Sequence, residues 1–374
     1  MKKCVKIINM RYLDYEGKQI TVGGVQTYIT NLAKVAKELE MNVEVYQFAE
    51  NDFVVQYNGI TVHGVKTVMK QDFNRKSLLL YKHCVKSYDP ERDILLFGTD
   101  IMIPRFKVDH AIAIQHGIGW DIESDEPCSR FQNVICMLRQ FRRSLIRTKC
   151  ASNVRKMICV DYNYINWYRT QILHREMDYQ VIPNFTEIPT ENLSKFDTEG
   201  VISIIFARRL VKYRGTRLFA EAIEKLLEEF NNLQITFAGD GPEENYLKNK
   251  FKSNANVRFI TYNSEESLYI HENKHIAVIP TVGSEGTSLS LLEAMASTCA
   301  VLCTNVGGMT NIVIDNFNGT MINPDAGQLY FALKKMIEDA EYRKNIAHEA
   351  YHTVQKGFSF DVWKEKWKKV LMEC

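Results

Sequence analysis

The stretch HIAVIPTVGSEGTSLSLLEAMASTCAVLCTN, residues 275–305, predicts one complete βαβ unit. A buried strand over Ile276 to Pro280 is followed by a loop of small residues over Thr281 to Ser288. A mostly apolar helix over Leu289 to Ser297 then leads to a second buried strand over Ala300 to Cys303. This unit contains the most informative chemistry of the chain.

Two carboxylates, Glu285 in the loop and Glu293 in the helix, are the only charged side chains of this unit. An ionised Glu293 is unfavourable in an apolar surrounding, so we expect it to face a polar cleft. Eight residues of helical rise place the two carboxyls roughly 12 Å apart, whereas a retaining glycosidase needs about 5 to 5.5 Å. The spacing therefore indicates two contacts on a long ligand. Between them, the N–H groups of Gly286, Thr287 and Ser288 open the helix, where the backbone dipole favours phosphate.

Residues 285–296, EGTSLSLLEAMA, resemble the signature of retaining glycosyltransferases of the GT-B fold, family 4, also called group 1. The resemblance implies that Glu285 contacts sugar hydroxyls, that Glu293 holds a ribose, and that the amides from Gly286 to Leu289 meet the diphosphate of a nucleoside diphosphate sugar. The alternative is a helix-capping glutamate and a surface glutamate. The EGTSLS variant, in which Thr287 and Ser288 replace the usual Phe-Gly, is similar to bacterial surface-polysaccharide transferases and leaves the sugar undefined.

Length and composition bound the class of protein. With 374 residues the chain is long enough for two domains, and 47 basic against 45 acidic residues give a net charge of +2. This balance argues against nucleic acid as a partner. Nine scattered cysteines without a Cys-x-x-Cys motif are typical of reduced, packed thiols in a cytoplasm. No apolar run approaches 18 residues, and Lys6 interrupts the first one, so we expect a cytoplasmic protein without a signal peptide or membrane span.

In the first half, strands are predicted at residues 5–10, 43–48, 60–65, 94–97, 111–115 and 156–160, and a last strand ends in Val-Ile-Pro-Asn at residues 181–184. Gly23 and Gly24 precede an amphipathic helix that runs to about Leu39, where paired glycines let a phosphate approach the helix N-terminus. Taken in isolation, a plain turn is the better explanation of the two glycines, but the resemblance implies contact with the donor phosphates. His116 follows the fifth strand and so lies at the edge where α/β sheets bind ligands. A structural role is the alternative; the resemblance implies a place near the donor sugar.

Residues 131–160 contain no acidic residue and seven basic ones, among them Arg139, Arg142, Arg143 and Arg147. An apolar stripe lies beside these arginines and comprises Ile135, Leu138, Phe141 and Leu145. A basic amphipathic helix can lie on an anionic membrane, which would suit a lipid-linked acceptor. The alternative is the solvated face of a packed helix.

The polar segment 190–200 is predicted as the interdomain linker, and the alternation of strands and helices after it predicts a parallel sheet. The first of these strands ends in ARRLVKYRG, residues 207–215. Two cations on this loop would neutralise a diphosphate leaving group. Either Arg209 and Arg214 or Arg208 and Lys212 fit; the resemblance selects Arg209 and Arg214 and leaves the other two as surface residues. The Gly-Asp-Gly of residues 239–241 is a weak dinucleotide signal.

Residues 348–352, HEAYH, match the zincin pattern H-E-x-x-H. On this helix the apolar face contains Ile346, Ala350 and Val354, so both histidines point away from it. Zincin catalysis needs them to face a cleft, and we therefore predict no metal in the active site.

Together these features predict an α/β protein of the GT-B fold, with two Rossmann-like parallel-sheet domains facing a deep cleft. Residues 1–188, completed by a C-terminal helix over 357–374, would bind a glycan or lipid-linked acceptor, and residues 189–356 would bind the nucleotide sugar. The expected reaction is retaining glycosyl transfer, with His116, Glu285, Arg209 and Arg214 at the reacting centre. No Asp-x-Asp motif occurs, so we expect neither metal nor cofactor. A nucleotide-sugar epimerase and a non-catalytic binding protein on the same scaffold stay open as alternatives.

Overall fold

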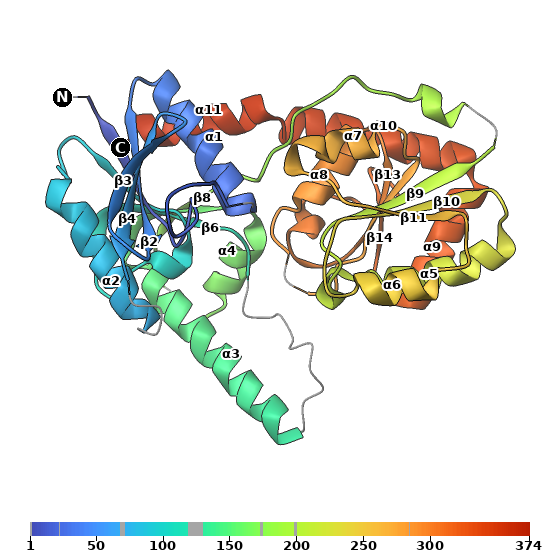
Figure 1. Ribbon diagram of the computed structural model, residues 1–374, viewed down its shortest axis with the longest axis horizontal. Coiled ribbons are helices and arrows are strands. Elements are labelled where there is room, and N and C mark those ends of the chain that lie inside the picture. Colours follow the sequence, from blue (N-terminus) through green and yellow to red (C-terminus); the bar gives the residue numbers. More distant parts are fainter. Residues whose placement is uncertain are drawn as a thin grey trace. The chain divides into compact units, whose positions relative to one another are not determined.

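The computed structural model describes residues 2–21, 23–67, 72–118, 130–172, 175–197, 200–283 and 285–374, without the side chains of residues 130–133. The chain forms two compact units, coloured mainly blue to green and yellow to red in Figure 1. The first unit comprises Met1–His116, Val134–Pro183 and Trp363–Cys374, and the second comprises Gly117–Asn133 and Asn184–Val362.

The first unit is built on an eight-stranded sheet in the order β3-β4-β2-β1-β5-β6-β7-β8, parallel except for the β3–β4 pair. Its strands are β1 (Cys4–Ile8), β2 (Asn42–Ala49), β3 (Phe53–Tyr57), β4 (Ile60–Lys66), β5 (Ile94–Phe97), β6 (Val108–Gln115), β7 (Val154–Cys159) and β8 (Asp178–Val181). Its helices are α1 (Gly24–Glu38), α2 (Phe73–Cys84), α3 (Arg130–Ala151), α4 (Tyr162–Arg169) and most of α11 (Phe360–Met372). The chain winds in opposite directions from β1, so the strand order reverses between β1 and β5, the place where such sheets bind ligands.

Strand β3 is the one element of this sheet that the sequence analysis missed. It pairs antiparallel with β4 through a two-residue turn at Asn58 and Gly59, both of which have a positive φ. Asn-Gly is the preferred sequence of such hairpin turns because both positions require left-handed backbone. The signal was therefore present in the sequence.

The second unit contains a six-stranded, fully parallel sheet in the order β11-β10-β9-β12-β13-β14. Its strands are β9 (Ile202–Ala207), β10 (Leu233–Ala238), β11 (Val257–Ile260), β12 (Ile276–Ile279), β13 (Ala300–Thr304) and β14 (Thr320–Ile322). Its helices are α5 (Thr216–Glu229), α6 (Glu244–Lys250), α7 (Ser267–His271), α8 (Leu289–Ala296), α9 (Ala326–Glu338) and α10 (Ala340–Gly357). The prediction of two parallel-sheet α/β units is confirmed, and β12, α8 and β13 begin and end within one residue of their predicted bounds.

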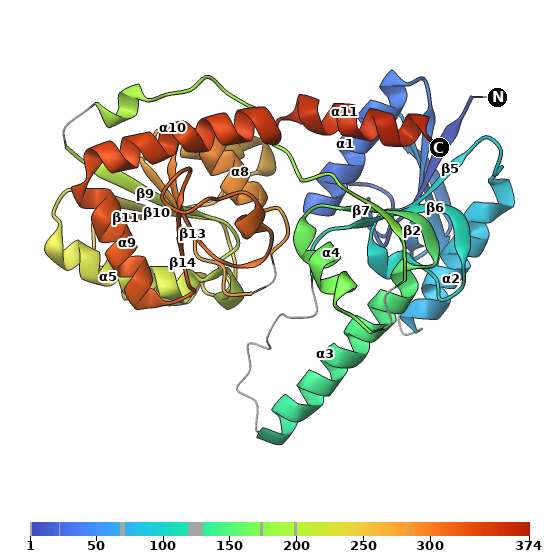
Figure 2. The same cartoon turned by 180° about the vertical axis from the view of Figure 1, so that it is seen from behind.

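Helix α8 is apolar on nearly all sides because it is covered on nearly all sides. Leu291, Leu292 and Met295 are fully buried, and the helix contacts β12, β13, α7 and α10. Figure 2 shows α10 running across this side of the sheet. The helix is thus held by its surroundings, and its N-terminal end can present a loop at a defined position.

The predicted linker over residues 190–200 is wrong in its position. The two units divide between Pro183 and Asn184, and residues 190–197 pack on the second unit. Buried Lys195 donates from Nζ to the carbonyl oxygen of Ser297, the C-cap of α8, at 2.8 Å. Lys195 is therefore polar because it bonds to the backbone of this unit, whereas Thr190, Ser194 and Asp197 are exposed. The assignment of acceptor and nucleotide sugar to the two parts of the chain stays a prediction.

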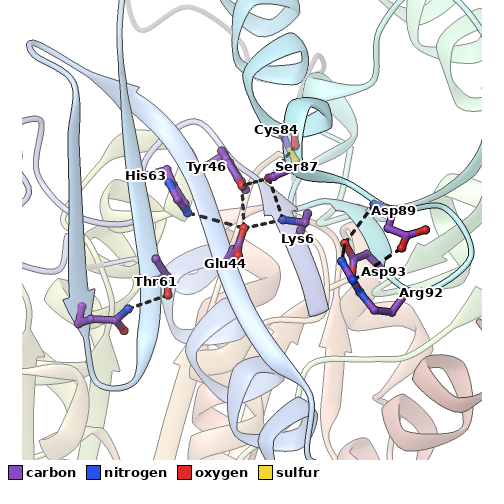
Figure 3. A network of polar contacts seen from close by, with 11 residues as sticks. Lys6, Glu44, Tyr46, Thr61, His63, Cys84, Ser87, Asp89, Arg92 and Asp93 are labelled. Carbon is purple, nitrogen blue, oxygen red and sulfur yellow. Dashed lines mark hydrogen bonds and ion pairs between the residues drawn. The ribbon is translucent and has the colours of Figure 1, made fainter. Parts of the chain in front are cut away.

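A polar network explains the charged residue in the first strand (Figure 3). Lys6 is buried on β1, and its Nζ lies 2.7 Å from Glu44 Oε2 and 3.0 Å from Ser87 Oγ. The hydroxyl of Tyr46 donates to the same Glu44 oxygen at 2.7 Å. A buried ammonium group is tolerated when it is paired and hydrogen-bonded in this way. We therefore assign the network to the core of the sheet.

Six of the described cysteines are buried thiols, as predicted, whereas Cys136 is half-buried and Cys374 is exposed. Eight of the nine are described and all eight are free; the ninth, Cys128, lies outside the described residues. Burial raises the pKa of Cys4 and of Cys303 to about 12, so both stay protonated and unreactive at neutral pH.

Candidate functional site

The carboxylate of Glu285 forms the centre of a charged cluster in the second unit. It lies in the loop between β12 and α8, and its Oε2 accepts hydrogen bonds from Arg208 Nη2 at 2.7 Å and from Thr281 Oγ1 at 3.0 Å. Arg214 Nη1 donates to the same oxygen. Only 9% of the Glu285 side chain is exposed, so this cluster is an interior arrangement of charges.

The cluster has more positive than negative charge. Burial by itself would raise the pKa of Glu285, but Arg208 and Arg214 hold it below its ordinary value, so the carboxylate is ionised. Two guanidinium groups and one carboxylate leave a surplus of one positive charge. In addition, Nε of buried Arg208 has no hydrogen-bond partner among the residues that the structure describes. An anion would satisfy both the charge and the donor.

The sequence analysis treated Arg208 as a surface residue, and this was wrong. Arg208 is 7% exposed and Arg209 is exposed. The backbone N–H of Arg208 bonds to the carbonyl of Ala238 at 2.9 Å and so continues the pairing of β9 with β10 by one residue. Side chains alternate along such a segment, which turns Arg208 inward and Arg209 outward. The contact of Arg209 with a donor stays a prediction.

Two glycines allow the backbone to pass close to the cluster. A Cβ on Gly307, whose φ is +56°, would lie 2.0 Å from the carbonyl oxygen of Glu285. A Cβ on Gly215, whose φ is +79°, would lie 1.7 Å from the carbonyl oxygen of Pro280. The N–H of Gly308 donates to the Glu285 carbonyl at 2.9 Å. These positions require glycine because both the φ angle and the space exclude a side chain.

Side chains that the sequence analysis gave no role in the site also hold its loops. Asn184 Nδ2 donates to the carbonyl of Thr287 at 2.8 Å, and Thr304 Oγ1 donates to the carbonyl of Thr281 at 2.5 Å. The only sequence signal for Asn184 is the Ile-Pro-Asn turn of residues 182–184. Nothing local marks Thr304, because its partner Thr281 follows a different strand.

The Gly-Asp-Gly of residues 239–241 supports the arginine loop. The carbonyl of Asp240 accepts from the N–H of Leu210 at 2.7 Å, and the carbonyl of Leu210 accepts from the N–H of Glu243 at 3.0 Å. The Gly-Asp-Gly motif, a weak dinucleotide signal in the sequence, therefore serves in the structure to hold the loop after β10 against the loop after β9.

Helix α8 begins at Leu289 after the N-cap residue Ser288. Thr287 and Ser288 are buried, and Gly286 and Leu289 are half-buried. The structure thus places the four predicted phosphate-contacting residues at the N-terminus of the helix, next to the Glu285 cluster. Such an end carries partial positive charge.

Glu293 lies further along α8, where burial raises its pKa to about 7 and a hydrogen bond from Ser267 opposes this rise. Its neighbour Tyr262 has a pKa raised to about 12, by burial first and then by the charge of Glu293. Glu293 is therefore a half-buried glutamate beside Ser267 and Tyr262, and its contact with a ribose stays a prediction.

His116 belongs to the first unit and lies directly after β6. Its Nε2 lies 2.9 Å from the carbonyl oxygen of Gly98, which can only accept, so the Nε2 proton is present. Burial lowers its pKa to about 4, and the ring is neutral at pH 7. Tyr28 packs edge-on against the ring and receives a hydrogen bond from Trp367 Nε1 on α11 at 2.8 Å. The C-terminal helix thereby helps to position His116.

Gly23 and Gly24 lie at the N-terminus of α1, as predicted. Gly24 is exposed and Gly23 is half-buried. Both belong to the first unit together with His116, whereas the arginines and both glutamates belong to the second.

Comparisons with known proteins identify a matching family, relatives in sequence and structures of similar fold. Residues 191–353 match the family described as "Glycosyl transferases group 1". An uncharacterized glycosyltransferase of Methanocaldococcus jannaschii is 23% identical over 381 residues, which cover 93% of this chain and 94% of the relative. Sucrose-phosphate synthase from Thermosynechococcus elongatus has a TM-score of 0.76 at 13% identity and covers 100% of this chain and 99% of its own. The Anabaena protein HepE, solved in complex with UDP, has a TM-score of 0.70 at 14% identity and covers 100% of both chains.

Residues 191–353 thus match the group 1 glycosyltransferase family, and the fold of the chain is GT-B. The Glu285 cluster and α8 both lie inside the matched region.

Proposed function

We propose that this protein is a retaining glycosyltransferase of family 4 that moves a sugar from a nucleoside diphosphate sugar to a glycan or lipid-linked acceptor in surface polysaccharide synthesis. The observation that carries the proposal is the buried cluster of Glu285, Arg208 and Arg214 with its surplus positive charge. The group 1 match over the same residues supports the reaction class, and the UDP bound to HepE supports a nucleotide donor. The acceptor type follows from the resemblance of the EGTSLS loop.

In this proposal the Glu285 cluster and the N-terminal end of α8 bind different parts of the donor. Arg208 and Arg214, with Arg209 from the same loop, stabilise the departing diphosphate, on which negative charge develops in the transition state. The amides from Gly286 to Leu289 receive its oxygens. Glu285 orients the sugar through its hydroxyl groups, and Glu293 holds the ribose. Because the arginines supply the charge that a divalent cation would supply, the transfer needs neither metal nor cofactor.

In the first unit, His116 positions the donor sugar and Gly23 and Gly24 contact its phosphates. A neutral imidazole suits this place because a protonated one would repel the positive charge that develops at the anomeric carbon. Transfer with retention then proceeds by front-face attack. The bond between the anomeric carbon and the diphosphate oxygen breaks, the acceptor oxygen bonds to that carbon, and the acceptor proton passes to the leaving diphosphate.

Buried polar atoms at one edge of the first sheet support an acceptor site there. Asn9, Thr99 and Gln115 follow or end β1, β5 and β6, and Asp161 follows β7. Each is nine-tenths or more buried and has a side-chain oxygen or nitrogen without a partner among the described residues. Hydroxyl groups of a glycan are matching partners for such atoms.

Helix α3 supports peripheral contact with an anionic membrane. Between 49% and 61% of Val134, Met137, Leu138 and Phe141 is exposed, and these residues recur at helical spacing. Arg139, Arg142 and Arg143 on the same helix are also exposed, whereas Arg147 is half-buried and bonds to the carbonyl of Asp100. Figure 1 shows the N-terminal half of α3 projecting from its sheet. Within the described residues, no helix is long and apolar enough to cross a bilayer.

The test of the reaction is nucleotide release from UDP-, GDP-, ADP- and dTDP-sugars in EDTA, with extracted membrane lipid as acceptor. We expect turnover of one donor and at least a hundredfold loss in Glu285→Gln. Glu228→Gln is the matched control, because Glu228 is an exposed glutamate of the same unit. Binding of every donor without release would refute the transferase and favour the epimerase or the binding protein.

The test of membrane contact is co-sedimentation with vesicles of phosphatidylglycerol or phosphatidylcholine. We expect binding to the anionic vesicles alone, and its loss when both Leu138 and Phe141 are replaced by Ser. Ile172→Ser is the matched control, since Ile172 is 98% exposed in the same unit. Equal binding of all three proteins would contradict the proposal.

A further inference from the structure

The two histidines of the H-E-x-x-H pattern meet a third side chain from a distant part of the sequence. His348 and His352 are one turn apart on α10, with ring centroids 4.4 Å apart. Glu191 lies 157 residues before His348, and its carboxylate faces both rings. Glu191 Oε1 is 2.7 Å from His348 Nδ1, and Glu191 Oε2 is 3.7 Å from His352 Nε2.

The three side chains lie close enough together to ligate one metal ion after their side chains rotate. One ligand atom from each residue can be chosen so that all three lie within 4.8 Å of one another. Ligands on a tetrahedral zinc ion, with bonds of about 2.0–2.2 Å, lie about 3.4 Å apart. Side-chain rotations that change these separations by up to about 1.4 Å reach that spacing, and both imidazoles are partly exposed and free to make them.

A hydrogen bond to His352 already orients one ligand. Its Nδ1 lies 3.3 Å from Gln355 Oε1, an atom that only accepts. The proton is therefore on Nδ1, and the Nε2 lone pair points toward the side of Glu191. Metal-bound histidines usually donate their second N–H to an oxygen in the same manner.

Both parts of the backbone that carry the three residues are held in place. Tyr351 of α10 donates to the carbonyl of Pro189 at 2.8 Å, and the N–H of Asn192 donates to Thr298 Oγ1 at 3.0 Å. Glu191 thus lies between two anchored residues, and the loss of conformational entropy on metal binding is small.

We propose that Glu191, His348 and His352 form a binding site for a divalent transition metal of the zinc type, with water as fourth ligand. Two imidazoles and one carboxylate suit Zn²⁺, whereas Mg²⁺ requires oxygen ligands in octahedral geometry. The bound ion joins segment 184–197 to α10 and stabilises the second unit. The site contains no residue of the Glu285 cluster, so it goes beyond the proposed function.

The experiment is a titration of the untagged chain with ZnCl₂ against a chromophoric chelator, followed by thermal unfolding. Cys374→Ser is the background, because Cys374 is exposed and a thiolate is itself a zinc ligand. We expect one zinc ion per chain at this site, and a more than tenfold loss of affinity in Glu191→Gln, His348→Ala and His352→Ala. Zinc at a hundred times its dissociation constant raises the unfolding midpoint by about 5–10 °C, and MgCl₂ does not.

His110→Ala is the control, because His110 is an exposed histidine of the first unit. Zinc affinity that is the same in all four variants, or that is lost equally in His110→Ala, would overturn the site and leave an ion pair of Glu191 with the histidines. The same variants separate this inference from the proposed reaction. Turnover of Glu191→Gln in EDTA tests the proposed reaction alone, because the metal site is then absent. Zinc binding by Glu285→Gln tests the metal site alone, because the reaction is then disabled.

Discussion

The substitution Glu285→Gln tests the charged cluster most directly. It removes the negative charge that faces two guanidinium groups while preserving the shape of the side chain. Side-chain exposure is 5% for Arg208 and 9% for Glu285, so their pair is a buried one, whereas 25% of Arg214 is exposed. Removing one partner of a buried ion pair lowers the free energy of unfolding by about 3–5 kcal/mol. Because the glutamine oxygen and Thr281 still accept hydrogen bonds and Arg214 is partly solvated, we expect about 3 kcal/mol.

The assay is amide hydrogen exchange of the full chain, since it reports the two units separately. A loss of about 3 kcal/mol accelerates exchange in β12 and β13 roughly 100-fold, at one factor of ten per 1.4 kcal/mol. Exchange in β1 and β5 of the first unit should not change, which provides an internal control. Glu228→Gln should leave both units unaffected.

A second substitution separates the lost ion pair from general disturbance. The double variant Arg208→Met, Glu285→Gln removes both buried charges, and replacement of a buried pair by uncharged groups is often nearly neutral. Exchange of β12 and β13 should then return toward the wild-type rate. If Glu285→Gln changes exchange less than threefold, or if the double variant exchanges faster than the single one, the cluster does not contribute to stability as argued.

Three further predictions follow from the surroundings of single residues. Because the pKa of Glu293 is raised to about 7, its protonated form stabilises the fold by about 3 kcal/mol below pH 4.5, and this contribution is lost as the pH rises through 7. Between pH 4.5 and 8 the unfolding midpoint of the wild type should therefore fall relative to that of Glu293→Gln, and parallel curves would contradict this. The pKa of buried His271 is lowered to about 4, so its contribution is present above pH 6.5 and is lost as the pH falls through 4; His271→Asn should flatten that acid loss in the same measurement. Gly307→Ala should reduce turnover at least tenfold, because the added Cβ displaces Glu285. Gly357→Ala is the control, because its Cβ would meet open space, and equal turnover of the two variants would show that the close contact has no role.

The fold could be predicted where the hydrophobic pattern was complete within one segment. Strands β12 and β13 are uninterrupted apolar runs because parallel strands are covered on both faces, and α8 is apolar for the same reason. The segment 190–197 was predicted as a linker from its polar composition, but its Lys195 is buried and bonds to the end of a helix about 100 residues away. A local pattern does not distinguish such bonds from exposure to water.

The candidate site shows the same division. Spacing alone placed Glu285, Glu293 and the helix N-terminus in one unit, since a loop and the helix after it are contiguous in the chain. The register in which β9 pairs with β10 decides whether Arg208 or Arg209 points inward. This register is set by backbone hydrogen bonds between the two strands.

The amino-acid sequence by itself determined the α/β class, the βαβ unit around Glu285 and the resemblance to group 1 glycosyltransferases. These features depend on periodicity and on neighbours along the chain. Only the tertiary structure decided that Arg208 pairs with Glu285 and that Glu191 faces His348 and His352. Both contacts join residues more than 70 positions apart, and their partners are chosen by the packing of the sheet and its helices, which no local pattern encodes.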